Sequence, residues 1–390
     1  MSTLTKHIAY FVHDLTDAAV HRRTRMLILG GARVTVIGFR RSDKIYDKVE
    51  GSKVVDLGRT YDARLGRRVY EVAKAAVSFR AQLTAIADAD GFIARNLEML
   101  LLAVRARMLL RKNLPITYEC LDVHRLQISS GLTGQCIRAL EASLCTRADL
   151  LITSSPAFIT QYFSQFGKIN LPIELVENKV LEKGETTTSA TVREAKPPWV
   201  IGWFGSLRCT RSLTILDELV TQLPGLVKVV TAGRPASGVF SNFESLIDKS
   251  KDIVFLGPYR NPEDLQPLYS QVHFSWALDY YEDGANSNWL LPNRLYEGGL
   301  YSAIPISLHY TETGRWLAEK KIGVLLTDPV ELSLLEFFKK LTSDRYLQLQ
   351  MEIARLSRSN WAHNVDECQK LVSQIVEHPT QEPERWHQSY

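Results

Sequence analysis

The sequence of 390 residues contains few cysteines and no long apolar run. The five cysteines are scattered, without a Cys-x-x-Cys pair or a histidine at zinc-binding spacing, so they are expected to be reduced and mostly packing residues. No stretch approaches the roughly 18 apolar residues that indicate a membrane-spanning helix, and no signal-peptide core precedes the first predicted strand. We therefore expect the protein to be made and kept in the cytoplasm.

Motifs of several large enzyme classes are also missing. No Gly-x-Gly-x-x-Gly sequence follows the first predicted strand, which argues against a nicotinamide or flavin enzyme. Gly-x-Ser-x-Gly and Walker loops are absent, and so are nucleic-acid-binding motifs. The composition, 45% hydrophobic and 23% charged, is that of an ordinary globular protein. We expect no bound cofactor, no metal ion and no nucleic-acid partner.

Strand-like apolar runs alternate with helix-period segments along the chain. This alternation predicts an α/β protein with two Rossmann-like, doubly wound domains that face each other across a cleft. A segment without an apolar period, which closes on Pro197 and Pro198, is typical of an interdomain linker. The predicted parts are a first domain over 1–182, a linker over 183–198, a second domain over 199–345 and a helical tail over 346–390 without strands.

Charge is unevenly divided along the chain. Residues 1–195 hold 28 Lys and Arg against 20 Asp and Glu, whereas the remainder holds 19 against 23. The basic residues of the first half gather in clusters such as 21–25, 64–68 and 105–112. Such clusters suit an anionic membrane surface or a phosphate-bearing acceptor, at about 1 kcal/mol for each basic residue near a membrane. Solvated helix faces are the alternative interpretation.

The segment 292–299 is the most informative part of the second half. Pro292 predicts a helix start, and Asn293 and Glu297 then share a face of that helix because they are four residues apart. Each glycine of the pair after Glu297 costs roughly 1 kcal/mol relative to alanine in a helix interior, which is tolerated where another backbone or a ligand comes close. The pattern predicts a small polar ligand beside this helix.

This segment resembles the carboxylate signature of nucleotide-sugar glycosyltransferases with the GT-B fold, especially those of family 4. The resemblance implies that Glu297 binds the ribose hydroxyls of a sugar nucleotide and that the helical tail packs back on the first domain. The chain departs from the family at Trp289, where another glutamate usually contacts the transferred sugar. Taken alone, Glu297 is equally an ordinary carboxylate favoured at a helix start.

A glycine turn between a strand and a helix, over 201–213, predicts an anion site in the second domain. Free backbone N–H groups and the positive end of a helix attract phosphate, and nearby arginines add fixed charge. The segment resembles the family's diphosphate-binding loop: Arg211 stands at the family's lysine, Ser206 replaces its arginine, and Arg208 is a possible substitute. An ordinary strand-to-helix turn is the alternative.

Two further segments complete the predicted donor site by resemblance. The turn 255–260 is similar to one that borders the nucleotide base, and the loop 280–289 to one that faces the diphosphate and the sugar. The expected nucleotide-sugar-binding residues are Gly205, Ser206, Arg208, Arg211, Tyr259, Asn288, Trp289, Asn293, Arg294 and Glu297.

Polar residues follow three predicted strands of the first domain. By resemblance, His124 is the first candidate at the reaction centre and Asp122 the second, and both join Arg211 as the predicted catalytic residues. A loop histidine bonded to the backbone is the alternative for His124. Asp17 is equally a helix N-cap. The residues expected to bind the acceptor are Asp14, Asp17, Arg95 and Asn96.

The whole set of features looks most like bacterial glycosyltransferases of succinoglycan-type exopolysaccharide assembly. The resemblance implies transfer of a hexose such as glucose from a UDP-sugar to a lipid-linked oligosaccharide, by a peripheral protein on the inner face of the cytoplasmic membrane. It also implies retention of anomeric configuration without a metal ion, with Arg211 stabilising the diphosphate. Two alternatives stay open. One is an inverting GT-B enzyme of glucuronosyltransferase type, with Asp14, Asp17 or Asp122 as base, and the other is a non-catalytic sugar-nucleotide-binding partner of polysaccharide assembly.

Overall fold

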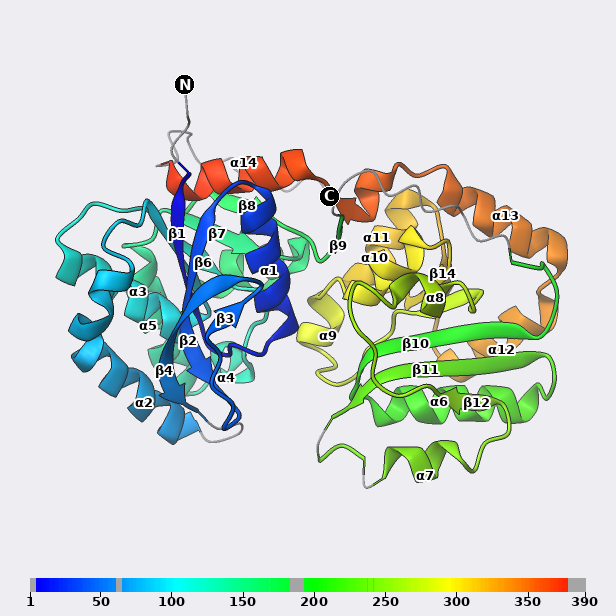
Figure 1. Ribbon diagram of the computed structural model, residues 1–390. Helices are drawn as coiled ribbons and strands as arrows, with labels where there is room; N and C mark the ends of the chain where they lie inside the picture. The colour runs from blue at the N-terminus through cyan, green and yellow to red at the C-terminus, as the bar shows by residue number, and fades with distance from the viewer. Residues whose placement is uncertain are drawn as a thin grey trace. The chain divides into compact units, whose positions relative to one another are not determined.

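The computed structural model describes residues 5–60, 65–167, 169–182, 193–236, 238–240 and 242–377. The chain folds into two compact units (Figure 1). One unit contains the residues up to Glu177 together with those from Asn364 onward, and the other contains Asn178–His363. The sequence therefore contributes to the first unit from both of its ends.

The first unit is built on a sheet flanked by helices. Its strands are β1 (His7–Val12), β2 (Arg33–Arg40), β3 (Lys48–Val49), β4 (Ser52–Arg59), β5 (Gly91–Arg95), β6 (Ile116–Glu119), β7 (Leu150–Thr153) and β8 (Ile173–Leu175). Its helices are α1 (Ala18–Leu29), α2 (Leu65–Ser78), the 3₁₀ segment η1 (Phe79–Ala85), α3 (Leu97–Leu110), α4 (Arg125–Ile128), α5 (Leu132–Cys145), the π-helical η2 (Phe158–Gly167) and α14 (Val365–Val376).

The strand order of this sheet is β3-β4-β2-β1-β5-β6-β7-β8. Only the β3–β4 pairing is antiparallel. All six residues of β1 are buried, as expected for a central strand covered on both faces. The chain first adds strands on one side of β1 and then crosses to β5 on the other side, so the order reverses between β1 and β5. Ligands of doubly wound sheets bind at such a switch point.

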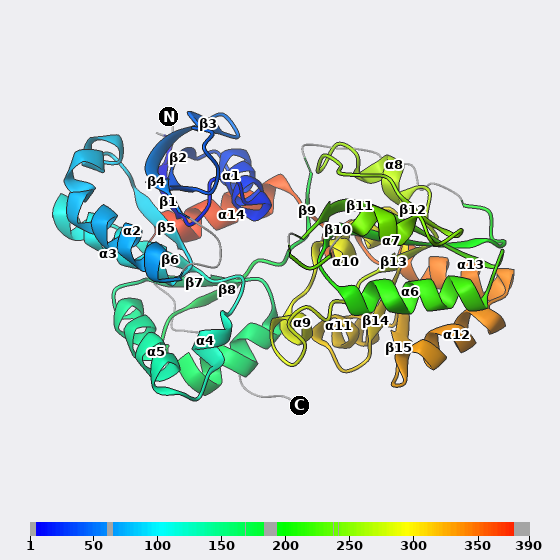
Figure 2. The same cartoon turned by 90° about the horizontal axis from the view of Figure 1, so that it is seen from below.

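Helix α14, from the carboxyl-terminal part of the chain, packs along α1 (Figure 2). Gly30, which ends α1, makes this contact possible because a Cβ there would overlap the backbone carbonyl of Cys368 on α14. Lys370 and Gln374 of the same helix also bind Glu174 of β8, at 3.4 and 2.8 Å. The end of the described chain is thus fastened to the first unit at two places.

The second unit is built on a parallel sheet. Its strands are β9 (Val180–Leu181), β10 (Trp199–Leu207), β11 (Val227–Pro235), β12 (Ile253–Phe255), β13 (Phe274–Trp276), β14 (Ile304–Leu308), β15 (Val324–Leu326) and β16 (Ala362–His363). Its helices are α6 (Thr210–Gln222), α7 (Phe243–Ile247), α8 (Leu265–Tyr269), α9 (Asn286–Trp289), α10 (Asn293–Leu300), α11 (Glu312–Lys320), α12 (Val330–Lys340), α13 (Ser343–Ala354) and the 3₁₀ turn η3 (Arg358–Asn360).

The main sheet has the order β12-β11-β10-β13-β14-β15, so its switch point lies between β10 and β13. Both sheets are doubly wound, which confirms the predicted fold class. Three tryptophan side chains, Trp199, Trp203 and Trp276, are at most 1% exposed and form part of the core. Close packing of such large groups holds the strand ends in fixed positions.

The structure places much of the predicted tail in the second unit. Tyr346 of α13 is fully buried there, with its ring 5.1 Å from that of Trp199 and 5.2 Å from that of His273. The tail also contains a short strand, β16, which pairs with β9, so the prediction of a strandless tail was wrong. A two-residue strand has no alternating pattern that the sequence could reveal.

Residues 183–192 of the predicted linker lie outside the described residues. The same holds for residues 378–390 of the predicted tail. The final part of the predicted linker belongs to the second unit. The buried guanidinium of Arg193 donates to the carbonyl oxygens of Tyr269, Tyr301 and Ser302, at 2.5, 2.7 and 2.8 Å. An arginine that is isolated in a polar sequence thus anchors the chain where it enters the second sheet.

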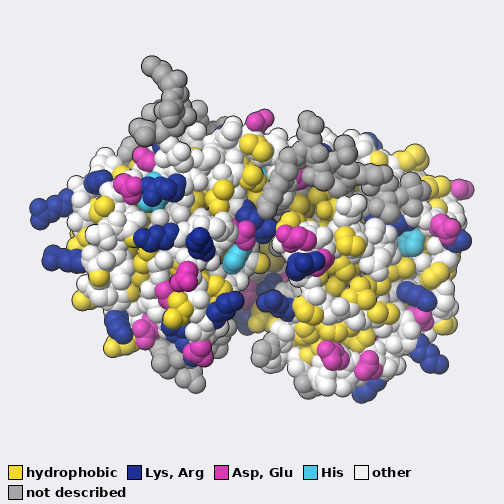
Figure 3. All heavy atoms as spheres, viewed as in Figure 1, with side chains coloured by type: hydrophobic (Ala, Val, Ile, Leu, Met, Phe, Trp, Pro, Cys, Tyr) yellow, Lys and Arg dark blue, Asp and Glu magenta, His cyan; other side chains and the backbone are white. Residues whose placement is uncertain are grey.

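The described part of the chain also tests two predictions made from composition. All five cysteines are unpaired, and four of them are buried, whereas Cys136 is exposed. Within the described ranges, each helix is too short or too polar to cross a bilayer. Figure 3 shows Lys and Arg side chains scattered over the visible face of the first unit, with acidic side chains among them.

Candidate functional site

An ion pair bridges the switch point of the second sheet. Arg208 follows β10 and Asp279 lies beyond the end of β13, and Nη2 of Arg208 lies 2.8 Å from Oδ2 of Asp279. Both residues therefore lie at the carboxyl ends of parallel strands, where the crossover of the chain leaves room for a ligand. Asp279 was not among the predicted site residues. Its position shortly after a buried strand is a signal that the sequence does contain.

Arg294 of α10 brings a second positive charge to Asp279. Its Nη2 donates to the carbonyl oxygen of Leu278 at 2.6 Å, and its Nε is buried without a hydrogen-bond partner. Burial lowers the pKa of Arg294, although Asp279 opposes this effect. Burial would raise the pKa of Asp279, but Arg294 and Arg208 outweigh it and hold that pKa below its usual value. Two guanidinium groups thus act on one carboxylate and favour its ionised form.

Arg211 adds a third guanidinium at the start of α6. It is exposed, and its guanidinium lies 4.3 Å from the centre of the Tyr280 ring, while that of Arg208 lies 4.9 Å from the Tyr281 ring. Tyrosine rings attract cations through their electron-rich faces, so the loop after β13 holds both arginines near the first turn of α6. That turn carries backbone N–H groups and the positive end of the helix dipole. Anion binding by this loop stays a prediction, and these are the groups that would carry it.

The backbone beside Arg208 is shaped by two glycines. Gly205 has a φ of +109° and Gly233, its partner on β11, has a φ of +136°, values that favour glycine. A Cβ on Gly233 would overlap the carbonyl of Gly205. The hydroxyl of Tyr259 lies 3.9 Å from the place of a Cβ on Gly205, and Ser206 is exposed. The two glycines thus let the ends of β10 and β11 approach each other closely.

Glu297 is a buried carboxylate on α10, 4% exposed. Its Oε1 accepts from Nδ2 of Asn261 at 2.7 Å and its Oε2 from the hydroxyl of Tyr269 at 3.1 Å. Burial, together with the charge of Glu297, raises the pKa of both Tyr259 and Tyr269 well above the usual value. These tyrosines therefore stay neutral hydrogen-bond donors. Sequence reasoning missed Asn261 and Tyr269, because neither follows a motif.

The other predicted donor-site residues differ in exposure. Asn293 is exposed although it lies one turn before the buried Glu297, because it is the first residue of α10. Asn288 and Trp289 are half-buried on the short helix α9. The glycine pair after Glu297 does admit close neighbours, because a Cβ on Gly299 would overlap the ring of Trp361. Here the neighbour that the glycine admits is a core side chain.

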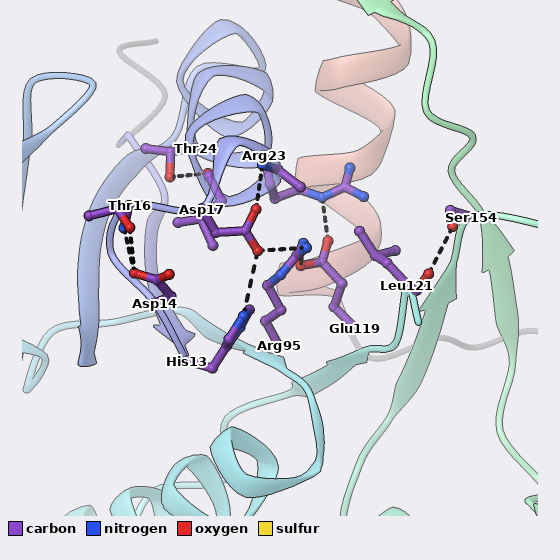
Figure 4. Close-up of polar contacts among 12 residues, drawn as sticks. His13, Asp14, Thr16, Asp17, Arg23, Thr24, Arg95, Glu119, Leu121 and Ser154 are labelled. Carbon is purple, nitrogen blue, oxygen red and sulfur yellow. Dashed lines mark hydrogen bonds and ion pairs between the residues drawn. The ribbon is translucent and has the colours of Figure 1, made fainter. Parts of the chain in front are cut away.

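The switch point of the first sheet also carries an acid–base pair (Figure 4). Nη2 of Arg95, at the end of β5, lies 3.2 Å from Oδ2 of Asp17. Nη1 of the same side chain lies 3.3 Å from Oε2 of Glu119, which is fully buried and also accepts from Tyr10 and Arg23 at 2.6 Å. Burial would raise the pKa of Glu119, but Arg23 and Arg95 lower it overall. Arg95 is 4% exposed, so its charge is paired with carboxylates inside the protein.

The remaining acceptor-site candidates are also engaged locally. Asp17 caps α1 by accepting from the N–H of Ala19 at 2.8 Å, which confirms the alternative interpretation of this residue. Asp14 accepts from the N–H and the hydroxyl of Thr16, and its other oxygen lies 3.1 Å from Nε of Arg41. Asn96 begins α3 with a φ of +71°, and its N–H donates to the carbonyl oxygen of Glu119. The structure therefore brings Asp17 and Arg95 together at the strand ends.

Asp122 and His124 are both exposed in the turn after β6. His124 is the N-cap of α4, and its Nδ1 accepts from the N–H of Leu126 at 3.2 Å. When Nδ1 accepts a hydrogen bond, a neutral imidazole carries its proton on Nε2. His124 is therefore bonded to the backbone, as its alternative interpretation held, and still presents an N–H donor on its other nitrogen.

The sequence contains one Asp-x-Asp pair, Asp88 and Asp90, a pattern that can bind metal ions. The structure places both residues at the amino ends of the strands, where Asp90 accepts from the N–H of His7 at 2.7 Å and Asp88 pairs with His7 and Arg33. Among the residues that the structure describes, no group of three or more His, Cys, Asp or Glu side chains could hold a metal ion.

Comparisons with known proteins agree with this architecture. No protein-family model matches the chain. Its sequence is 44% identical over 382 residues to the succinoglycan biosynthesis protein ExoL of Rhizobium meliloti (strain 1021), a match that covers 97% of this chain and 95% of that protein.

Solved structures with a similar fold include Anabaena Alr3699/HepE in complex with UDP and glucose, with a TM-score of 0.68 at 17% identity over 94% of this chain and 98% of that one. WaaG, a glycosyltransferase involved in lipopolysaccharide biosynthesis, matches with a TM-score of 0.61 at 12% identity over 94% and 100%. These likenesses show the GT-B fold that the sequence predicted.

Proposed function

Because the chain belongs to the family of the succinoglycan biosynthesis protein ExoL, we propose that it is a glycosyltransferase of exopolysaccharide assembly that uses a UDP-sugar as donor. The observation that carries this function is the gathering of three arginines at the switch point of the second sheet. Arg208 and Arg294 act there on one carboxylate, Asp279, and Arg211 stands beside them at the start of α6. A diphosphate is negatively charged and therefore complements these guanidinium groups. The structural relative HepE is in complex with UDP and glucose, which supports the same donor class here.

The donor diphosphate contacts Arg211 and the first backbone N–H groups of α6. Arg211 is exposed, and its guanidinium stacks on the ring of Tyr280, which holds that group in place. When the sugar leaves, negative charge grows on the diphosphate, and groups that are already oriented stabilise that charge without reorganising. Glu297 accepts hydrogen bonds from the ribose hydroxyls, and an incoming hydroxyl replaces the amide of Asn261, whose side chain is exposed.

The finer assignment is a hexose, such as glucose, transferred with retention to a lipid-linked oligosaccharide and without a metal ion. His124 contributes an N–H donor on Nε2 to the reaction centre. The acceptor carries a polyprenyl diphosphate. The excess of basic over acidic residues in 1–195 favours docking of the protein at an anionic membrane surface.

An inverting mechanism would require a carboxylate base from the first unit. Burial alone would raise the pKa of Asp17, but the charges of Arg95 and His13 outweigh burial and lower this pKa overall. The lowered pKa makes Asp17 a weaker base. Asp14 is 5% exposed and bound to Thr16 and Arg41. The exposed Asp122 is therefore the base that an inverting mechanism would use. A non-catalytic role is suggested only by Trp289, which replaces a family glutamate.

The function is tested by donor binding and turnover. A thermal-shift screen against UDP, GDP, ADP and their sugars should show the largest shift with UDP compounds, because a ligand at 100 times its dissociation constant stabilises the native state by about 2.7 kcal/mol. Labelled UDP-glucose should then transfer its sugar to a polyprenyl-diphosphate oligosaccharide. Binding without turnover would favour the non-catalytic alternative, and no shift with any nucleotide would contradict the proposal.

A further inference from the structure

One face of α5 supports the turn that carries His124. Gly134, Arg138 and Glu141 lie four and three residues apart on this helix, so they share a face. We call these three residues the α5 face. Each of them contacts α4 or the residues directly after it, although neither their spacing nor their composition forms a known motif.

Glu141 is a carboxylate without exposed surface that the proposed reaction does not use. The hydroxyls of Tyr118 and Tyr162 donate to its two oxygens, the first at 2.7 Å, and Nε2 of Gln127 donates to Oε1 at 3.0 Å. Burial raises the pKa of Glu141, while these hydrogen bonds lower it. One carboxylate on α5 therefore binds side chains of β6, α4 and η2.

Gln127 transmits this constraint to His124. Its side-chain oxygen accepts from the backbone N–H of His124 at 2.9 Å, while its Nε2 is held by Glu141 and lies 3.1 Å from the hydroxyl of Tyr162. Both ends of the amide are thus used, and its orientation is fixed by the network. Rotation of this amide would remove the bond that closes the turn at His124.

Arg138 and Gly134 fix the backbone of the same turn. Nη1 of Arg138 donates to the carbonyl oxygens of Gln127 and Ser129, at 2.5 and 2.8 Å. A Cβ on Gly134 would lie 2.8 Å from the carbonyl oxygen of Leu126 and would overlap that of Ser129. Since α4 has only four residues, it cannot hold its own geometry, and α5 supplies the missing contacts.

We propose that the α5 face is a positioning device that holds the imidazole of His124 in the orientation needed for sugar transfer. The proposal rests on the proposed function and on the role assigned to His124. Glu141 is therefore a positioning residue. It acts on the reaction through its hydrogen bond to Gln127, which in turn binds the backbone N–H of His124. A displacement of about 1 Å at a reacting group can lower turnover on the order of a hundredfold.

The test compares Glu141→Gln in the wild-type and His124→Ala backgrounds. In the wild-type background we expect kcat to fall by at least about tenfold while the dissociation constant for UDP stays within about twofold, because none of the proposed donor-binding residues lies on α4 or α5. In the His124→Ala background we expect no further fall, because two residues that act through one contact are not additive. Hydrogen exchange at the amides of His124 and Leu126 should become faster in Glu141→Gln.

Two further variants complete the design. Glu174→Gln, on β8 of the same unit, is the matched control and should change none of these readouts. Arg138→Ala tests the same face if Glu141→Gln does not fold, with the same expected results. Equal losses of kcat in both backgrounds, or faster exchange with unchanged kcat, would overturn the positioning role. If the wild type itself transfers no sugar, it is the proposed function that fails.

Discussion

Arg208 and Asp279 form a 2.8 Å ion pair across the strands between which the order of the second sheet reverses. Arg95 and Asp17 occupy the equivalent place in the first sheet, at 3.2 Å. The two pairs differ in what surrounds them. Arg95 is shared between Asp17 and the buried Glu119, so its charge is balanced internally. Asp279 is shared between two arginines instead, and Arg211 adds a third guanidinium on the neighbouring ring of Tyr280.

Arg211→Ala should weaken binding of UDP and lower turnover with little loss of fold stability. The side chain is exposed and stacks on the ring of Tyr280, and loss of one charge-assisted hydrogen bond to the ligand costs about 1.5 to 3 kcal/mol. Isothermal titration calorimetry with UDP measures this directly. Arg345→Ala, on α13, is the control and should leave the affinity unchanged. Unchanged affinity in Arg211→Ala would mean that the phosphate assignment is wrong.

Glu297→Gln should weaken the binding of UDP more than it weakens the binding of 2′-deoxy-UDP. The carboxylate accepts hydrogen bonds, and replacing one oxygen by an NH₂ group places a donor against the donors of Asn261 or Tyr269. If Glu297 binds the ribose, the wild type should discriminate between the two nucleotides by about tenfold or more, and the variant should lose that discrimination. Equal affinities of the wild type for both nucleotides would reduce Glu297 to a structural carboxylate.

Transfer should proceed with retention and should survive EDTA. His124→Ala should lower kcat more than it lowers donor affinity, whereas Asp122→Asn should leave measurable activity, because a retaining reaction does not require this carboxylate as base. NMR of the anomeric proton in the product gives the stereochemistry. An inverted product together with near-total loss of activity in Asp122→Asn would establish the inverting alternative.

The protein should bind anionic but not zwitterionic vesicles through its first unit. Binding should fade as salt shortens the Debye length from about 10 Å at 0.1 M to about 3 Å at 1 M. Lys74 and Arg80 are exposed basic residues of this unit, and charge reversal of both should weaken flotation. Equal recovery with the two vesicle types would exclude electrostatic docking.

Glu141 should give the stability an unusual pH dependence. Burial raises the folded-state pKa of this carboxyl above its ordinary value of 4.5, so the folded protein holds the proton more tightly than the unfolded chain does. The stabilising effect of this proton is then complete below about pH 4.5 and is lost as the pH rises through the folded-state pKa.

The variant Glu141→Gln cannot lose a proton at this position. Its melting temperature, compared with that of the wild type, should therefore improve as the pH rises from about 4.5 toward neutrality. A constant difference between the two proteins across this range would show that Glu141 keeps an ordinary pKa.

Much of the fold was accessible from local sequence patterns. The apolar runs of β1 and β10 and the helix signals after them predicted two doubly wound sheets, because both periodicities are properties of neighbouring residues. The glycine turn over 201–213 likewise predicted the strand-to-helix turn between β10 and α6. The short strand β16 and the assignment of α13 to the second unit were missed, because both depend on contacts with residues far away in the sequence.

The sequence could not determine which charged side chains are buried in ion pairs inside the protein. Arg95 ends β5 and Arg211 lies in the first turn of α6, and neither position shows from the sequence whether the charge is paired inside the protein. The tertiary structure buries Arg95 against Asp17 and Glu119 and leaves Arg211 exposed on the ring of Tyr280. Local sequence determined where polar groups meet the strand ends. Only folding decided which of those groups are paired, because burial and ion pairing depend on partners that are distant in the chain.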